Sequence, residues 1–484
     1  MKLGDTGQDD PHQLREDEHV PATAAHAQTA TPAETPVSGT AQTESPLTLN
    51  VWSLAWPTMA AAFMHTATRW VDVKMVGVIG ADAIAGVTAG GQLYWLIQTL
   101  VMAAATGLTA IVSRAYGSRN LQEVDHAHKQ SIWMGWLIGL GTWIGFIPLI
   151  GFSLAWLGLT GNAADQGADY MIWLLVGNVP MTLIFLTGAA LRAGGDTITP
   201  LWTGIIANVV NIFLNWVLIY GNLGSPAFGV AGAGMATSAA IVLHTLMIFG
   251  LWWRGWTILP RGLASWKLDL SMWRRLWKIG YPTGIEGLLF QLAMLSFMSF
   301  MALYGTEAFV AYQIGVQVLS FGFLPGHGFN VAAATMVGQY LGAGQPQRAM
   351  AAGWQTMRLA MLFMGLLGLG FIAVGEPLAR WFLDDDTVVP MAVTFIWILG
   401  FSLPLMSWDF TVGGALRGAG DTRTPLYTVM IALGLFRLLP GYIIAHVLHW
   451  DVVWLWSVLF LDYAARAIVL GLAFRRGKWQ NQQV

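Results

Sequence analysis

The most regular feature of the chain is a series of long apolar segments separated by short polar ones, beginning at Leu47. A helix needs about 20 residues to cross the roughly 30 Å hydrocarbon core of a bilayer. Twelve segments meet this length, and their continuous apolar character favours helices over the alternating strands of a β-barrel. The predicted spans are 49–76, 86–113, 127–152, 169–191, 200–221, 228–252, 278–303, 309–338, 352–375, 388–415, 425–447 and 451–474. The pattern predicts an all-α polytopic membrane protein.

Charged residues in the connections predict which side of the membrane each connection faces. Lys and Arg gather in alternate connections, above all after residue 252 and at the C-terminus, where Arg475, Arg476 and Lys478 stand. The opposite connections carry mainly acidic residues, including the run Asp384 to Asp386. Because cytoplasmic connections are enriched in basic residues, both termini are predicted to be cytoplasmic.

Composition agrees with lipid as the solvent. Only 10% of the residues are charged, whereas soluble chains have about 25%. The net charge of −2 gives no reason to expect a nucleic-acid partner, and the absence of cysteine excludes disulfides, thiolate metal sites and cysteine nucleophiles. Residues 1–46 contain almost no large apolar side chains and no signal-peptide pattern, so they are expected to form a disordered cytoplasmic tail.

A gapless internal repeat divides the remaining chain into two halves. The sequence "ALRAGGDTITPLW" at 190–202 returns as "ALRGAGDTRTPLY" at 415–427, an offset of 225 residues. The same offset relates Pro57 to Pro282, Gly80 to Gly305 and Gly117 to Gly342. With six helices each, the halves would enter the membrane in the same orientation, as two parallel bundles. The predicted organisation is an N-terminal lobe at 47–252, a cytoplasmic linker at 253–277, a C-terminal lobe at 278–475 and a short tail at 476–484.

The repeated motif is typical of a tight turn between two helices. Its glycines suit the left-handed conformation that ends a helix, a preceding arginine suits the last helical turn, and Thr199 or Thr424 can cap the next helix with proline at its first position. A structural turn is therefore favoured over a binding site. The residues assigned to these turns are Arg192, Asp196, Pro200, Arg417, Asp421 and Pro425.

These motifs together resemble the multidrug and toxic compound extrusion family. The resemblance rests on the paired turns, on "VDVKMVGVIGADAIAGV" at 71–87 and on "NVVNIFLNWVLIYG" at 208–221, and it covers about 47–475. It implies a prokaryotic antiporter of the cytoplasmic (inner) membrane, with a central cavity between two lobes. Such a protein exports organic, mainly cationic and amphipathic compounds in exchange for protons or sodium. The family implies no cofactor, and a monomer in the lipid bilayer is expected.

Asp72 is the principal candidate for cation coupling. It resembles the helix 1 aspartate of the branch similar to the DNA-damage-inducible F proteins, and Asn211 matches a polar partner on helix 5. The chain departs from that pattern at Asn215, where a second aspartate is expected. A proton or sodium site lined by Asp72 with Asn178, Asn208, Asn211 and Asn215 is one interpretation. A static ion pair between Asp72 and Arg69, within i,i+3 reach, is the alternative.

Further polar residues at membrane depth are candidates for coupling or for the substrate cavity. The resemblance gives Glu286 and Asp409 a partial match to acidic coupling positions of other family branches. A buried carboxylate is costly in hydrocarbon and tends to face a cavity or a partner. Pro325 and the glycines around His327 are expected to interrupt helix 8. Substrate-cavity candidates are Gln291, Gln313, Gln317, Tyr312 and Asn208.

Secondary active efflux by alternating access is the leading functional prediction. A lipid-linked oligosaccharide flippase is an alternative, disfavoured because few basic residues lie at membrane depth, chiefly Arg69, Arg437 and Arg466. An integral membrane enzyme is a second alternative, disfavoured because no catalytic set converges in the sequence. The sequence contains no phosphate loop or nucleotide fingerprint.

Overall fold

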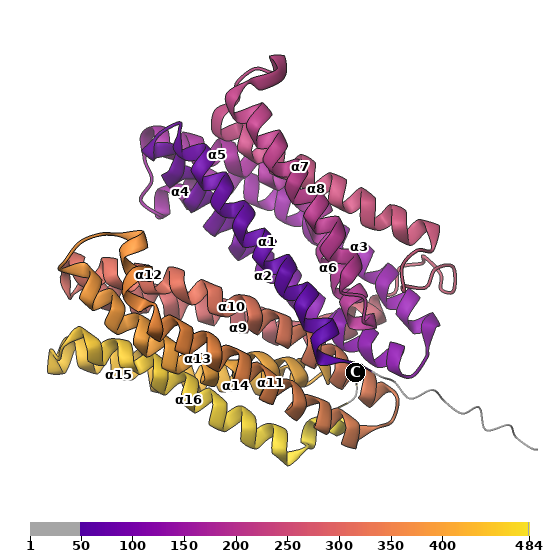
Figure 1. Cartoon of the computed structure of the whole chain (residues 1–484). Coiled ribbons are helices and arrows are strands. Elements are labelled where there is room, and N and C mark those ends of the chain that lie inside the picture. The colour runs from indigo at the N-terminus through magenta and orange to yellow at the C-terminus, as the bar shows by residue number, and fades with distance from the viewer. Residues whose placement is uncertain (1–48, 483) are drawn as a thin grey trace, which may run out of the picture. The chain divides into compact units, whose positions relative to one another are not determined.

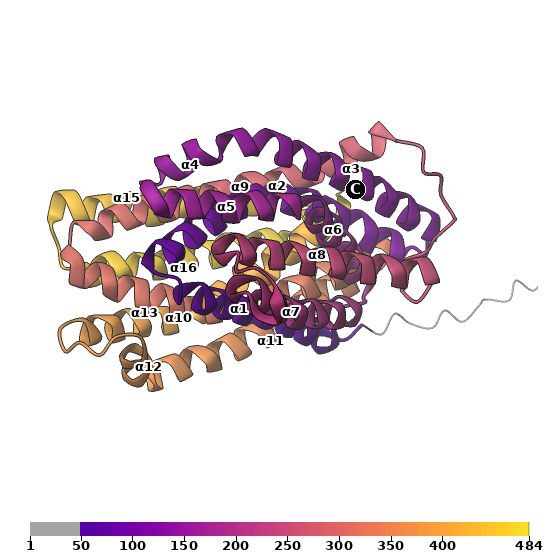
Figure 2. The same cartoon turned by 90° about the horizontal axis from the view of Figure 1, so that it is seen from above.

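The computed structural model describes residues 49–482 and Val484, and these residues form helices joined by short connections. The predicted tail at 1–46 lies outside the described residues. The N-terminal half comprises α1 (Val51–Gly77), α2 (Ala81–Gly117), α3 (Leu121–Phe146), α4 (Ile150–Trp156), α5 (Gly161–Val176), α6 (Asn178–Gly194), α7 (Ile198–Tyr220) and α8 (Gly229–Arg254). The C-terminal half comprises α9 (Leu270–Ala302), α10 (Gly305–Gly342), α11 (Pro346–Ala373), α12 (Gly375–Phe382), α13 (Val388–Gly418), α14 (Arg423–Ile431), α15 (Leu439–Tyr442) and α16 (Val452–Arg476). Figures 1 and 2 show the helices of both halves running broadly along one direction.

Most of these helices have the length and composition of membrane spans. Within the described residues, ten are long and apolar enough to cross a membrane, and the pair α5 and α6, bent by 54°, makes an eleventh if it is one span. The remaining predicted span is α1, which has 27 residues and carries Arg69 and Asp72. The chain is thus a multi-pass membrane protein with an all-helical fold.

Several prolines lie inside continuous helices. Pro325 lies inside the continuous helix α10, so the expected interruption of helix 8 is wrong. A proline removes one backbone hydrogen bond, and the helix nevertheless continues through Pro325 to Gly342. Pro57, Pro282 and Pro404 also lie within continuous helices. Pro180 stands near a bend, three residues after Gly177, where α5 meets α6.

Close contacts between the halves follow the sequence repeat. A Cβ added to Gly328 on α10 would lie 2.7 Å from the Ala55 carbonyl oxygen on α1, and one added to Gly280 on α9 would collide with the Ala103 carbonyl on α2. Positions 55 and 280, and 103 and 328, are each related by the offset of 225 residues. The two contacts are therefore equivalent by the internal repeat: each half contributes the glycine to one contact and the carbonyl to the other.

A second set of contacts closes the end of the bundle that carries the linker between α8 and α9, here called the linker end. A Cβ on Gly117 would collide with the Gln339 carbonyl, and a Cβ on Gly342 would collide with the Arg114 carbonyl. The 225-residue offset relates Gly117 to Gly342 and Arg114 to Gln339, so these two contacts are also equivalent by the repeat. Backbones approach this closely only where one residue has no side chain. We call these two pairs the glycine seam.

The linker is fastened to α3 by a buried ion pair. Asp125 accepts hydrogen bonds from the backbone amides of Leu263 and Ala264, both at 2.8 Å, and pairs with Lys129 at 2.8 Å. Asp269 caps α9 and contacts His126 at 2.9 Å. Because of this cap, α9 begins at Leu270, and the last residues of the predicted linker 253–277 are helical.

Described residues of the segment predicted as a short tail, 476–484, pack on the folded chain. Trp479 is 1% exposed and stacks on Phe474, with ring centroids 4.7 Å apart. The Val484 carbonyl accepts a hydrogen bond from Arg275 at 2.9 Å, and the Gln482 carbonyl accepts one from Arg114. An aromatic side chain that finds an apolar pocket holds its segment in place.

Candidate functional site

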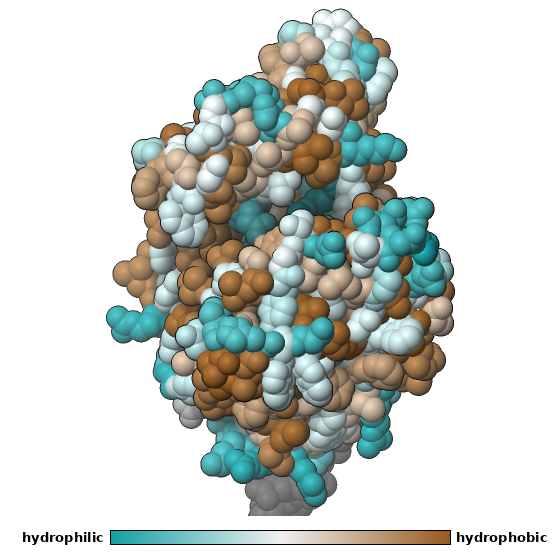
Figure 3. All heavy atoms as spheres, turned by 90° about the vertical axis from the view of Figure 1, so that its left-hand side faces the viewer, coloured by the Kyte–Doolittle hydropathy of each residue, from teal (hydrophilic) through white to brown (hydrophobic). Residues whose placement is uncertain are grey.

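A cavity of about 850 Å³ lies between the two halves. Figure 3 shows the molecule hollowed between them, seen from the end opposite the linker. The cavity wall reaches from Trp156 and Leu157 at that end to Arg417 and Gly418 near the linker end, where the glycine seam closes it. Aromatic residues in the wall are Trp95, Trp156, Phe185, Phe290, Phe323, Phe410 and Tyr463. Apolar and aromatic walls with few polar groups suit amphipathic organic molecules.

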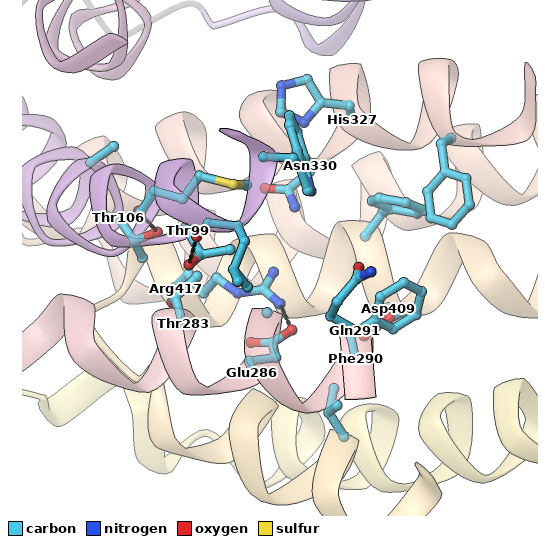
Figure 4. Close-up of a pocket in the computed structure, with 18 of the residues that line it drawn as sticks. Thr99, Thr106, Thr283, Glu286, Phe290, Gln291, His327, Asn330, Asp409 and Arg417 are labelled. Carbon is cyan, nitrogen blue, oxygen red and sulfur yellow. Dashed lines mark hydrogen bonds and ion pairs between the residues drawn. The ribbon is translucent and has the colours of Figure 1, made fainter. Parts of the chain in front are cut away.

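The C-terminal half contributes ion-paired charges to this wall. Glu286 on α9 pairs with Arg417 on α13 at 2.6 Å, and Figure 4 shows the two side chains pointing toward one another. Asp409 on α13 pairs with Arg466 on α16 at 2.8 Å. All four line the cavity. Each carboxylate of the cavity wall thus has a guanidinium partner, which offsets the cost of an isolated charge in apolar surroundings.

Behind the wall, the same network continues into the bundle. Arg466 also pairs with Asp462 at 3.0 Å, and Asp462 pairs with Arg437 at 3.5 Å. Arg437 lies in the π-helical segment Ala432–Leu438 between α14 and α15, with its guanidinium 5.0 Å from the ring centre of Phe297. Asp462 was not among the residues predicted for the site. Its i,i+4 spacing from Arg466 is the signal that could have found it.

Asp72 belongs to a separate polar cluster in the N-terminal half. Its carboxylate accepts a hydrogen bond from the Asn215 amide at 2.6 Å, and Asn215 also donates to Asn211 at 3.2 Å. If the amide oxygen and nitrogen of Asn211 are exchanged, Asn211 donates to Asp72 as well, at 3.2 Å. Among the described residues, Asp72 and Arg69 form no ion pair within 4 Å, so the static pair with Arg69 is not observed. Asp72 does not line the cavity described above.

Two asparagines expected at Asp72 lie elsewhere. Asn178 is fully buried and bonds to Gln98 at 3.2 Å and to Thr142 at 2.6 Å, between α2, α3 and α6. Asn208 is half-buried on α7 and contributes neither to the Asp72 cluster nor to the cavity wall. Asn208 is one helical turn from Asn211, and that turn moves it away from Asp72.

The cavity includes only part of the predicted substrate set. Gln291 lines it, whereas Gln313, Gln317 and Asn208 do not. Tyr312 is 1% exposed and packs between Phe297 and Phe395 in the C-terminal core. Gln313 and Gln317 share a helix face at i,i+4, but this spacing does not determine whether the face meets the cavity or another helix. His327 and Asn330 are in the wall instead.

The repeated turn motif has the predicted glycine conformation but different helix caps. Gly195 and Gly420 adopt the predicted left-handed conformation, with φ of 108° and 89°. The caps differ from the prediction, because Asp196 and Asp421 accept hydrogen bonds from the backbone amides of Thr199 (2.9 Å) and Thr424 (3.1 Å).

The prolines and arginines of the same motif also depart from the predicted turn. Pro200 and Pro425 are the third residues of their helices rather than the first. Arg192 and Arg417 lie in the last turns of α6 and α13, as predicted, yet their side chains line the cavity. The motif is a turn that also places a guanidinium on the cavity wall in each half.

Comparison with known proteins gives the same architecture. The MatE family model matches residues 57–217 and 282–443, one segment in each half. The "probable multidrug resistance protein NorM" of Thermotoga maritima is 28% identical over 433 residues, covering 89% of this chain and 93% of the relative. A relative of the same description from Mesorhizobium japonicum is 28% identical and covers 86% of this chain and 91% of its own. A solved structure of a MOP superfamily transporter from Pyrococcus furiosus superposes with a TM-score of 0.81 at 18% identity, covering 90% of this chain and 96% of that chain.

Proposed function

The chain belongs to the MatE family, and on that premise we propose that it is a secondary active multidrug efflux antiporter. It would export organic compounds, mainly cationic and amphipathic ones, in exchange for protons or sodium ions. The cavity supports this proposal, because its aromatic walls can hold flat apolar compounds and the ring faces attract cations. The basic connections support placing both termini on the cytoplasmic side of a bacterial inner membrane.

The observation that carries the coupling proposal is the difference between the two halves. Glu286 and Asp409 are each held by an arginine, whereas Asp72 is held by asparagine amides alone. A proton or sodium ion can bind Asp72 without displacing a guanidinium. The Asn215 amide oxygen is buried and has no hydrogen-bond partner among the described residues, so it offers a second oxygen ligand beside the carboxylate. We therefore assign cation coupling to Asp72 with Asn211 and Asn215.

Transport would proceed by rocking of the two halves about the linker. In the structure, the glycine seam closes the linker end and the cavity opens toward the other end. Cation binding at Asp72 can drive the exchange only if its affinity differs between the two states. The contact between Asp72 on α1 and Asn215 on α7 supplies a place for that difference, because α1 also packs on α10 of the other half.

The flippase alternative is less well supported than efflux. Three arginines line the cavity, Arg192, Arg417 and Arg466, and of these Arg466 was predicted to lie at membrane depth. Two of them are neutralised by carboxylates. A lipid-linked pyrophosphate with several negative charges would need more free cationic groups. Export of an aromatic organic cation without flipping of lipid-linked oligosaccharide is the outcome expected here.

The test is coupled flux in vesicles containing the purified full chain. An imposed proton or sodium gradient should drive movement of an aromatic organic cation, and measuring at fixed pH with and without sodium identifies the ion. Asp72→Asn should abolish gradient-driven flux, because an amide neither binds a proton nor neutralises sodium. The control is Asp82→Asn, which removes an exposed carboxylate of the same half that contacts Asn162. Gradient-driven flux that survives Asp72→Asn would refute the assignment.

A further inference from the structure

Arg192 is the one charged residue of the cavity wall without a partner among the described residues. Five charged side chains line the cavity, and four of them form the pairs Glu286 with Arg417 and Asp409 with Arg466. Within residues 49–482 and Val484, the guanidinium of Arg192 makes no ion pair and no hydrogen bond, although its backbone carbonyl accepts one from Thr335. The wall therefore carries one uncompensated positive charge.

The sequence repeat explains how this charge arises. Arg192 and Arg417 are related by the 225-residue offset, and both guanidiniums run back over a glycine four residues earlier, Gly188 and Gly413. The C-terminal half neutralises its arginine with Glu286. The position that corresponds to Glu286 in the N-terminal half is Ala61. The two halves thus place the same cation on the wall, and only one of them supplies the carboxylate.

An unpaired guanidinium on a largely apolar cavity wall is costly unless water or an anion solvates it. Arginine binds carboxylates in a two-pronged geometry that combines charge with two hydrogen bonds. Phe185 and Ala189 precede Arg192 on α6 by seven and three residues, so they share its helix face, and both line the cavity. An aromatic ring and a guanidinium therefore lie along one stripe of the wall.

We propose that Arg192 is an anion-binding subsite of the cavity, which accepts the carboxylate of amphipathic aromatic compounds. The substrate class then includes zwitterions and organic anions besides cations. This inference rests on the proposed export function, and it adds a specificity residue that the turn motif alone did not reveal.

Equilibrium binding with a matched pair of probes tests the subsite. The probes are an aromatic tertiary amine that carries a carboxylate and the methyl ester of the same compound, each titrated into the purified full chain in detergent. Arg192→Gln should weaken binding of the carboxylate probe about ten- to hundredfold, the range expected for loss of a charged hydrogen-bonded contact. Binding of the ester should change by less than about twofold. Arg254→Gln, which removes an arginine outside the cavity wall, is the control and should affect neither probe.

Two further measurements keep the test decisive. Glu286→Gln frees Arg417 from its partner and should strengthen binding of the carboxylate probe, a change opposite in direction to that of Arg192→Gln. Added chloride should compete with the carboxylate probe and not with the ester. If chloride abolishes the preference for the carboxylate probe over the ester, the subsite binds inorganic anions and the substrate proposal is overturned. Equal weakening of both probes by Arg192→Gln, or no weakening, also overturns it. Absence of gradient-driven export of the ester by the wild-type chain would instead refute the proposed function, and the binding result would stand.

Discussion

The glycine seam provides a quantitative prediction about which conformational state the protein occupies. Gly117→Ala adds one methyl group at the end of α2, where it would collide with the Gln339 carbonyl oxygen and lie 2.7 Å from the Gln339 Cα. Both atoms belong to the backbone of α10, so neither can rotate away. Overpacking of this kind costs the closed state about 1–3 kcal/mol. The helix stability that alanine regains, about 0.5–1 kcal/mol, is the same whether the seam is closed or open, so it does not change the ratio of the two forms.

This cost exists only while the seam is closed. A state in which the halves separate at the linker end does not include the collision, so the ratio of closed to open forms should fall about 5- to 150-fold. Because the chain contains no cysteine, Ser118→Cys and Gln347→Cys introduce a unique pair of label sites on exposed residues of the two halves near the seam. The distance distribution between spin labels at these sites, measured in lipid, should shift toward longer distances in Gly117→Ala.

The control is Gly141→Ala on α3, where an added Cβ meets no atom within 4 Å. It should leave the label distances unchanged and either leave the thermal stability unchanged or raise it slightly. A folded Gly117→Ala variant with the same distance distribution as the wild type would show that the seam does not hold this state closed. The structural argument about its close approach would then be refuted.

Three further predictions concern the linker and the C-terminal residues. Asp125→Asn removes the partner of a buried lysine and should cost about 3–5 kcal/mol, detected as faster proteolysis within 255–269 and a lower midpoint of thermal unfolding. The hydrogen bond from His126, with help from two backbone amides, holds the pKa of Asp269 below its usual value. This contact should therefore stabilise the fold at neutral pH by at most about 1 kcal/mol, and the effect of Asp269→Asn on the unfolding midpoint should vanish as pH falls through the lowered pKa. Trp479→Ala empties a buried site and should cost about 3–5 kcal/mol, measured by thermal unfolding in detergent.

Each of these has a clear contrary result. Unchanged proteolysis of the linker in Asp125→Asn would mean that other contacts hold it. A loss of stability in Asp269→Asn that persists at acid pH would point to a packing role instead of a charged one, because a depressed pKa contributes only where the carboxylate is ionised. A wild-type unfolding midpoint in Trp479→Ala would show that the C-terminal residues pack too weakly to matter.

The sequence alone located the membrane-spanning helices and the duplication, because both depend on local properties. Length and apolar character set a span, and the offset of 225 residues relates the two halves wherever it is sampled. The left-handed turns at Gly195 and Gly420 were also predictable, since short-range backbone sterics favour glycine there. The expected interruption at Pro325 was wrong, since the helix stays continuous past this proline.

The tertiary structure decided which polar side chains meet. Asp72 bonds to Asn215, 143 positions away, and Glu286 pairs with Arg417, 131 positions away. Helical periodicity shows which residues share a face, and it does not show which helix that face meets. For this reason Tyr312, proposed for the cavity, lies in the core, and Arg192, proposed for a turn, lies on the cavity wall. A buried charge at membrane depth requires a partner or water, and only the packing of helices distant in sequence determines which of the two it has.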